Sequence, residues 1–339
     1  MWKKILLGIL LILMVFSIWN WHWVTYGYFQ ARGQLKVILD ARPIQEFIED
    51  PNFPDSLKDK LRLTQVVRRY AIDSLGLHQS ENYTKLYDQE GKTLLWNVSA
   101  SEPYELKAYR WKFPILGSMP YKGFFDLEKA KVEAEQLKAQ GYDVRIRTVG
   151  GWSTLGILED PLLSNMLERN EGSLAEVIIH ELTHATIFIK NEIEFNENLA
   201  SFIGERGAEL FLTSHFGDSS NQHMEYLQSE RDSRTLTQII LKGAKRLDSL
   251  YTSFSENDSM ALKDSLKSQL IREITVNLDT TEFYNPRYRE IFATTQPNNA
   301  YFMAFRRYHD QEDSIQSIYS SYNRNFKLMI SDLKSKYGK

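Results

Sequence analysis

The sequence predicts an α+β protein in which a strand-rich middle section lies between helical sections. Two observations carry this prediction. Apolar residues recur at helical spacing before residue 77 and again from about residue 171 onward, whereas residues 77–170 hold short aromatic runs separated by glycine and proline. The 339 residues are 42% hydrophobic and 25% charged, so the chain has ordinary globular composition and ample material for a core.

Residues 1–25 are expected to form a signal anchor, a transmembrane segment that holds the rest of the chain at a membrane. Lys3 and Lys4 precede an apolar run that extends, with polar interruptions, from Ile5 to Val24. This run reaches the ~20 residues that cross a bilayer, and no small-residue cleavage site follows it. Because basic residues favour the cytoplasmic side, residues 26–339 are expected on the periplasmic side of the inner membrane. A cleaved signal peptide is the alternative.

Residues 26–76 are expected to be helical. A first helix runs up to Pro43 and a second begins there, because proline suits the start of a helix and interrupts its interior. The helical pattern continues from Asp55 to about Leu75, where apolar residues share one face.

Residues 77–170 are expected to be rich in strands that form a mixed sheet. Aromatic runs bounded by glycine and proline predict strands, and Asp126 is a good first residue for a helix that Gly141 would end. The expected elements are strands at 83–87, 93–98 and 104–113, a helix at 127–139, a strand at 144–149 and a loop at 150–170.

Residues 171–216 are expected to hold two helices, at 174–190 and 196–214. The remaining section, 217–339, is expected to be mainly helical, because its charged amphipathic pattern contains little glycine or proline outside a connection at 285–299. Residues 26–339 together are expected to form one domain, since no repeat or long low-complexity tract divides them.

The charge balance and the lack of cysteine exclude several classes of function. The chain has 41 basic and 44 acidic residues, for a formal net charge of -3, so no basic excess indicates nucleic-acid binding. It contains no cysteine, so it has neither disulfides nor thiolate metal ligands. Any metal site must therefore use histidine, aspartate or glutamate.

The sequence His180-Glu181-Leu182-Thr183-His184 has the H-E-x-x-H pattern of zinc hydrolases. On a helix, residues four apart lie on one face, so two imidazoles can hold one Zn²⁺ while Glu181 reaches a water molecule as general base. Ser173 is expected to cap this helix, with Glu176 completing a capping box. The alternative, two solvated histidines on a surface helix, fits poorly with the apolar residues on either side of the motif.

A third ligand is needed, because zinc hydrolases commonly use three protein ligands and keep one position open. Glu197 follows His184 at a distance that allows one helix to end, a turn at Lys190-Asn191, and Glu197 in the first turn of the next helix. Small residues at Ala200, Gly204 and Ala208 would let the two helices approach closely enough to share an ion.

Other interpretations of these acidic residues stay open. Glu205, on a neighbouring face of the same expected helix, is the alternative ligand. Glu192 and Glu194 are expected to be charged residues of the turn between the two helices. Glu197 could instead be an acid near a helix N-terminus, with the small residues serving only tight packing.

The segment from His180 to Gly204 resembles the gluzincin arrangement, H-E-x-x-H followed by N-E-x-x-A, with a shorter gap than in thermolysin or the large zinc aminopeptidases. The chain is more similar to the bacterial family of putative aminopeptidases, many of which look like lipoproteins. The resemblance implies a zincin-like metallopeptidase domain with a Zn²⁺ ion and a peptide substrate. It is carried, besides the motif, by blocks at 33–35, 41–44, 96–98, 111–114, 121–125, 153–156 and 195–197.

In gluzincins the substrate backbone lies along an edge strand that precedes the metal helix. The strand at 144–149 occupies that place here, and Gly150, Gly151 and Trp152 after it are the candidate substrate-binding residues, because glycine lets a peptide backbone approach closely. An ordinary strand that ends in a glycine turn is the alternative. Four candidates for a donor to the developing oxyanion lie in the C-terminal part: Tyr284, Tyr288, Tyr301 and His309.

The function expected from these residues is hydrolysis of peptide bonds by a zinc-dependent, membrane-anchored metallopeptidase. Two alternatives remain: an envelope protein that binds zinc and peptides without catalysis, and a zinc hydrolase acting on a non-peptide amide. The intact Glu181 argues against the first, because a structural zinc site needs no general base. The more specific term aminopeptidase is implied only by the family resemblance.

Overall fold

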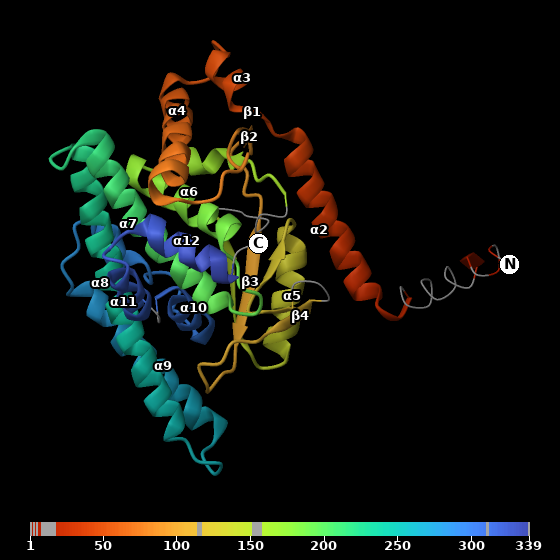
Figure 1. Ribbon diagram of the computed structural model, residues 1–339. Helices are drawn as coiled ribbons and strands as arrows, with labels where there is room; N and C mark the ends of the chain where they lie inside the picture. The colour runs from red at the N-terminus through yellow and green to blue at the C-terminus, as the bar shows by residue number, and fades with distance from the viewer. Residues whose placement is uncertain are drawn as a thin grey trace.

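The computed structural model is an α+β arrangement in which long helices surround three small sheets (Figure 1). The helices account for most of the length of the chain, and the strands are short. The structure describes residues 2, 4, 6–7, 18–113, 117–150, 158–309 and 312–337.

Helix α2 (Trp21–Asp40) leads from the N-terminal segment to the body of the protein and leans away from the other helices in Figure 1. It ends before the expected Pro43, because Arg42 and Pro43 form strand β1 and pair with Leu86 and Lys85. Within the described residues, no helix is both long and apolar enough to cross a membrane. Residues 8–17, at the centre of the predicted anchor, lie outside the described residues.

The next helices follow the sequence prediction closely. The helix expected over 55–75 is present as α4 (Asp55–Tyr70) and a final π-helical turn, η1 (Ala71–Leu75), which ends at Gly76 with a left-handed φ of 85°. A short helix, α3 (Ile44–Glu49), begins immediately after the proline, as expected from the fixed backbone of that residue.

The strands form three small sheets, not the single mixed sheet expected from the sequence. Each strand has only two to six residues before a turn interrupts it, which leaves little length for broad pairing. The sheet orders are β1-β2-β8, β6-β3-β7 and β4-β5, with bounds β2 (Lys85–Tyr87), β3 (Trp96–Ser101), β4 (Trp111–Phe113), β5 (Gly117–Met119), β6 (Lys122–Phe124), β7 (Asp143–Thr148) and β8 (Leu162–Leu163).

Helix α5 (Leu127–Ala139) packs on the second sheet. Its predicted bounds are confirmed, and the Asp126 carboxylate caps it by accepting hydrogen bonds from the backbone N–H groups of Glu128 and Lys129. The expected loop at 150–170 is partly wrong, because strand β8 and a 3-10 helix, η2 (Ser164–Glu168), lie within it.

The two helices of the predicted metal site are α6 (Glu171–Thr186) and α7 (Ile193–Phe216). Helix α6 starts and ends earlier than expected. Asn170, not Ser173, is its N-cap, and the Asn170 side chain accepts a hydrogen bond from the Ser173 backbone N–H. Asparagine caps a helix as well as serine does. The extra turn begins with Glu171, whose negative charge interacts favourably with the positive end of the helix dipole.

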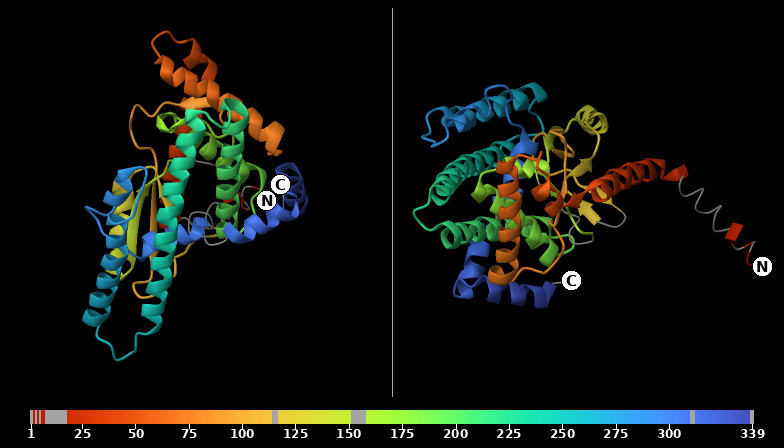
Figure 2. Two further views of the ribbon diagram at one scale, coloured as in Figure 1. Left: turned by 90° about the vertical axis from the view of Figure 1, so that its left-hand side faces the viewer. Right: turned by 90° about the horizontal axis from the view of Figure 1, so that it is seen from above.

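The C-terminal part is helical, as expected. Figure 2 shows two long helices side by side, α8 (Asn221–Thr252) and α9 (Met260–Asp279), which project from the body as a hairpin. The chain then returns to the body and packs against α7 and β7. The remaining elements are η3 (Pro286–Glu290), α10 (Asn299–His309), α11 (Glu312–Ser321) and α12 (Phe326–Tyr337).

Candidate metal centre

The side chains of His180, His184 and Glu197 meet between α6 and α7. The two histidines lie one turn apart on α6, and their Nε2 atoms are 3.2 Å apart. The Oε2 atom of Glu197 lies 3.7 Å from each Nε2. Candidate ligand atoms of all three residues lie within 4.8 Å of one another. The structure therefore brings together the three side chains that the sequence pattern singled out.

Close packing of α6 and α7 makes this meeting possible. A Cβ atom added to Gly204 would lie 3.1 Å from the Glu176 carbonyl oxygen and 3.2 Å from the Cβ of His180. Gly207 is also restricted, because its added Cβ would lie 3.1 Å from a side-chain carbon of Ile179 on α6 and 2.8 Å from Leu75 of η1. The expected close contact between the helices is confirmed at Gly204, whose neighbours on α6 include His180 itself.

The residues on either side of Glu197 hold the start of α7 in place. The Asn196 side-chain amide donates a hydrogen bond to the Ile189 carbonyl oxygen at 2.7 Å. It also accepts one from the Ile189 backbone N–H at 2.9 Å. These two bonds close the turn between the helices. The Asn198 amide donates to the Arg307 carbonyl oxygen on α10. Glu197 lies in the second turn of α7, because the helix begins at Ile193, earlier than expected.

The electrostatics of the group favour an ionised carboxylate. Burial alone would raise the pKa of the Glu197 carboxyl, but the imidazoles of His180 and His184 outweigh it and hold that pKa well below its usual range. Burial would likewise lower the pKa of His180, and the carboxylates of Glu197 and Glu181 raise it instead. Protons and a divalent cation would therefore compete for the same imidazole nitrogens.

The donor set and its spacing fit a zinc ion. Zinc takes imidazole nitrogen and carboxylate oxygen as ligands, and bonds of about 2.0–2.1 Å in tetrahedral geometry place two nitrogens about 3.3 Å apart. The 3.2 Å between the two Nε2 atoms agrees with that spacing. The other ring nitrogen of His184, Nδ1, is buried and has no hydrogen-bond partner among the described residues, so these neighbours do not fix its tautomer.

Glu181 is half-buried on α6, between the two histidines in sequence. A phenol that sequence reasoning missed lies on its side of the helix: burial raises the pKa of Tyr83 well above its usual value, and the charges of Glu181 and Asp160 add to this effect. The Tyr83 hydroxyl has no hydrogen-bond partner among the described residues, and its backbone has a left-handed φ of 62°. Such a conformation is uncommon outside glycine.

The alternative ligands lie elsewhere. Glu205 faces Glu176, whose pKa is raised to about 7 by burial and by the charge of Glu205, and Tyr226 donates a hydrogen bond to Glu176 at 3.1 Å. Glu192 is exposed at the start of α7, and Glu194 lies 3.8 Å from Arg110 at the surface. Glu192 precedes α7 in the connection, as expected, whereas Glu194 belongs to the first turn of the helix.

The strand predicted to hold substrate is the edge of its sheet. Strand β7 pairs with β3 on one side, and no other described strand pairs with it. The space beside Gly150 is filled, because an added Cβ would lie 2.6 Å from a guanidinium nitrogen of Arg169. Gly151 and Trp152, the other two candidates, lie outside the described residues.

None of the expected oxyanion donors has a described contact with the three metal candidates. Tyr284 is 65% exposed, and Tyr288 stacks on Phe283 with ring centroids 5.2 Å apart. Tyr301 lies under the guanidinium of Arg145, which is 4.5 Å from its ring centroid. The side chain of His309 lies outside the described part of the chain.

Tyr121, Arg147 and Tyr308 lie near enough to Glu197 for its charge to act on them, and sequence reasoning missed all three. Arg147 donates a hydrogen bond to the Tyr308 hydroxyl at 2.9 Å. Burial raises the pKa values of Tyr121 and Tyr308, and the charge of Glu197 is the next cause for both. The one signal available was the pair Arg145 and Arg147, two cations on one face of a strand that precedes the metal helix.

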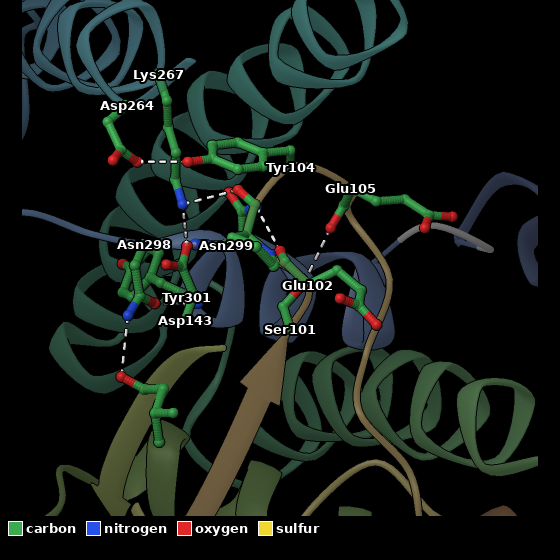
Figure 3. A network of polar contacts seen from close by, with 12 residues as sticks. Ser101, Glu102, Tyr104, Glu105, Asp143, Asp264, Lys267, Asn298, Asn299 and Tyr301 are labelled. Atoms are coloured by element: carbon green, nitrogen blue, oxygen red, sulfur yellow. Dashed lines mark hydrogen bonds and ion pairs between the residues drawn. The ribbon is translucent and has the colours of Figure 1, made fainter. Parts of the chain in front are cut away.

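A polar network fixes β7 against α10 (Figure 3). The Asp143 carboxylate at the start of β7 accepts from Lys267 of α9 at 2.7 Å and from the Asn299 backbone N–H at 2.8 Å. The Asn298 amide donates to the Val144 carbonyl oxygen at 2.9 Å. Further along both elements, the Arg145 guanidinium lies over the Tyr301 ring and Arg147 donates a hydrogen bond to Tyr308. Helix α10 therefore runs beside β7 in the same direction.

The described cavities do not contain the three metal candidates. One cavity of about 650 Å³, lined by residues from α2, the 78–85 segment and the 158–161 segment, reaches α6 at Ala185. It therefore borders the metal helix without including His180, His184 or Glu197.

Comparison with known proteins gives one match. The family model described as putative aminopeptidase matches residues 25–337, nearly the whole chain. No curated protein matches it, and no solved structure does.

Proposed function

Because the chain belongs to the putative aminopeptidase family, whose model covers residues 25–337, we propose that it is a zinc-dependent metallopeptidase. One observation supports the zinc dependence above all: two imidazoles and one carboxylate from α6 and α7 converge within 4.8 Å, with Glu181 beside them. Zinc hydrolases commonly use such a three-ligand set and leave one position for water or substrate.

The reaction follows from the chemistry of these residues. When bound, a zinc ion would supply a Lewis acid that makes water more acidic and polarises the scissile carbonyl. Glu181 would accept the proton of the attacking water and pass it to the leaving amine. His180, His184 and Glu197 would bind the zinc ion, and the close contact of α6 with α7 would fix the distances between these three side chains.

We also propose that the protein acts on peptides at a membrane. Lys3 and Lys4 before an apolar run support an N-terminal anchor with the peptidase domain on the periplasmic side. Fractionation of the full-length protein with membranes, and resistance to alkaline carbonate extraction, would be the expected result. A mature N-terminus near residue 25 would show a cleaved signal peptide instead.

Substitution of Glu181 by glutamine tests the proposed function. Glu181→Gln keeps the shape of the side chain but cannot accept a proton at neutral pH. We expect hydrolysis of a peptide library, followed by mass spectrometry, to fall by about a hundredfold or more, because this is the usual contribution of a positioned acid or base. Zinc content and thermal unfolding should stay near those of the wild type.

Glu192→Gln is the matched control, since it makes the same change at an exposed position on the adjoining turn. It should cleave the library at the wild-type rate. Near wild-type hydrolysis by Glu181→Gln would contradict the mechanism. If neither form cleaves peptides but both bind them with zinc, the protein is a binding module rather than a peptidase.

A further inference from the structure

Three guanidinium groups gather between β7 and α10, and in the part of the chain that the structure describes none lies within ion-pair distance of a carboxylate. Arg145 and Arg147 point to the same face of β7 because they are two residues apart, and Arg307 on α10 is only 5% exposed. Across the described ranges, none of the three forms an ion pair. Neighbouring cations are paired: Lys122 with Glu133 at 2.7 Å, Lys267 with Asp143 at 2.7 Å and Arg306 with Asp248 at 3.2 Å.

The three arginines contact aromatic rings instead. The Arg145 guanidinium lies 4.5 Å from the Tyr301 ring centroid, and that of Arg307 lies 5.4 Å from the Tyr121 ring centroid. Contacts of this kind offset only part of the free energy needed to bury a cation. Burial lowers the pKa of Arg145, and the charges of Arg147 and Arg307 lower it further, so the positive charges repel one another. An anion bound between them would remove this repulsion.

The cluster lies near the candidate metal centre. Arg147 donates a hydrogen bond to the Tyr308 hydroxyl, and the charge of Glu197 acts on both side chains. Asn198, next to Glu197, donates to the backbone of Arg307 and so ties the two parts of the site together. An anionic group bound by the arginines would therefore lie close to a carbonyl held at the metal centre. One substrate molecule could supply both groups.

We propose that Arg145, Arg147 and Arg307, with Tyr121 and Tyr308, form a subsite for a carboxylate group of the substrate. Guanidinium groups bind carboxylates through paired hydrogen bonds, and tyrosine hydroxyls can add further donors. The same charges repel an N-terminal ammonium group, so a free substrate amine would not occupy this side. The carboxylate could belong to the C-terminus of a peptide or to an acidic side chain. This proposal rests on the proposed peptidase function.

Two pairs of short peptides separate these sources. The first pair is trialanine as the free acid and as the C-terminal amide. The second pair consists of amidated peptides that carry either glutamate or glutamine at one position. Each is given to the full-length protein as wild type, Arg147→Gln, Arg147→Lys and Arg306→Gln. Arg306→Gln is the matched control, because it removes an arginine on the same helix that is paired with Asp248.

For the wild type we expect kcat/KM for the charged member of one pair to exceed that of its neutral partner by about tenfold to a hundredfold, the range of a charge-assisted hydrogen bond. The pair that shows the preference identifies the source of the carboxylate. Arg147→Gln should reduce this ratio to near unity, and Arg147→Lys should restore part of it. Arg306→Gln should keep the wild-type ratio. The ratio reports recognition even if a variant loses some folded protein.

Binding gives a second measurement that does not need turnover. Calorimetry with Glu181→Gln should show tighter binding of the charged peptide, and Glu181→Gln combined with Arg147→Gln should lose that difference. If the wild type showed equal kcat/KM values and Glu181→Gln showed equal affinities for the charged and neutral peptides of both pairs, the subsite would be overturned. An equal loss on all peptides in Arg147→Gln would also overturn it, since that outcome indicates a structural role. If no peptide is cleaved, the proposed peptidase function fails, and the binding difference alone decides the subsite.

Discussion

The two sides of the candidate site have opposite chemistry. The α6–α7 side presents imidazoles and carboxylates, which are ligands for a cation. The β7–α10 side presents guanidinium and phenol groups, which are donors suited to an anion. Glu197 lies where the sides meet, because it contacts the histidines and its charge acts on Arg147 and Tyr308.

This difference gives the site a direction. A peptide whose carbonyl lies at the metal centre would be drawn with its negatively charged part toward β7 and α10. Each side also has its own scaffold, a tightly packed helix pair for one and a strand joined to a helix by a polar network for the other. Variants that disturb one scaffold should therefore leave much of the other side intact.

Removal of a metal ligand should produce the largest effect and act mainly on the α6–α7 side. His184→Ala and Glu197→Ala should lower zinc from about one ion per chain to below about 0.1 by metal analysis, because three ligands are the usual minimum for a zinc hydrolase. The preference for binding charged peptides should survive in part. Glu205→Gln is the control and should retain its zinc. A loss of zinc in the Glu205 variant alone would show that the third ligand is misassigned.

Asp143→Ala should disturb the β7–α10 side with an intermediate effect. It leaves Lys267 without its partner and removes the acceptor of the Asn299 backbone N–H. We expect unfolding in urea to show a loss of about 3 kcal/mol, as for other broken partly buried ion pairs, together with a smaller preference for carboxylate peptides. Zinc content should remain near wild type. Asp264→Ala, which removes only an exposed hydrogen bond from Tyr104, should change stability by about 0.5 kcal/mol or less.

The smallest effect concerns pH and the carboxyl pair behind the metal helix. The pKa of Glu176 is raised by burial and by the charge of Glu205 to about 7, above the 4.5 of a free glutamate. The folded state therefore binds a proton that the unfolded state releases, and this contribution is present below about pH 4.5 and lost as the pH rises through 7.

Urea unfolding at pH 5 and pH 8 measures this loss, which should be about 1–3 kcal/mol in the wild type. Glu176→Gln should remove most of it, and Glu192→Gln, at an exposed position, should not. An unchanged pH dependence in the Glu176 variant would mean that its carboxyl does not hold the proton.

The α6–α7 side could be predicted from sequence because its information is local. The spacing of His180 and His184 requires only one helical turn, and Glu197 follows after a single short connection. The same reasoning placed the Asp126 cap correctly and missed the cap of α6, since Asn170 and Ser173 are both good capping residues and only packing selects between them.

The β7–α10 side could not be predicted in the same way. Arg147 and Tyr308 are 161 residues apart, and no spacing rule relates them. The period of two in a strand puts Arg145 and Arg147 on one face of β7, but it does not say which element covers that face. The sheets were also misjudged, because strands of two or three residues are fixed by their neighbours more than by their own propensity.

The polar network that joins β7 to α10 also has a consequence for the order of folding. Its hydrogen bond between Asn299 and Asp143 closes a loop of 156 residues, whereas α6 and α7 are joined by a short connection. Local contacts generally form faster than distant ones, because closing a long loop costs more chain entropy. During synthesis, α6 and α7 emerge before α10. The pair of helices that gathers the imidazoles can therefore assemble first, and the arginine side is completed only after residue 309 has been made.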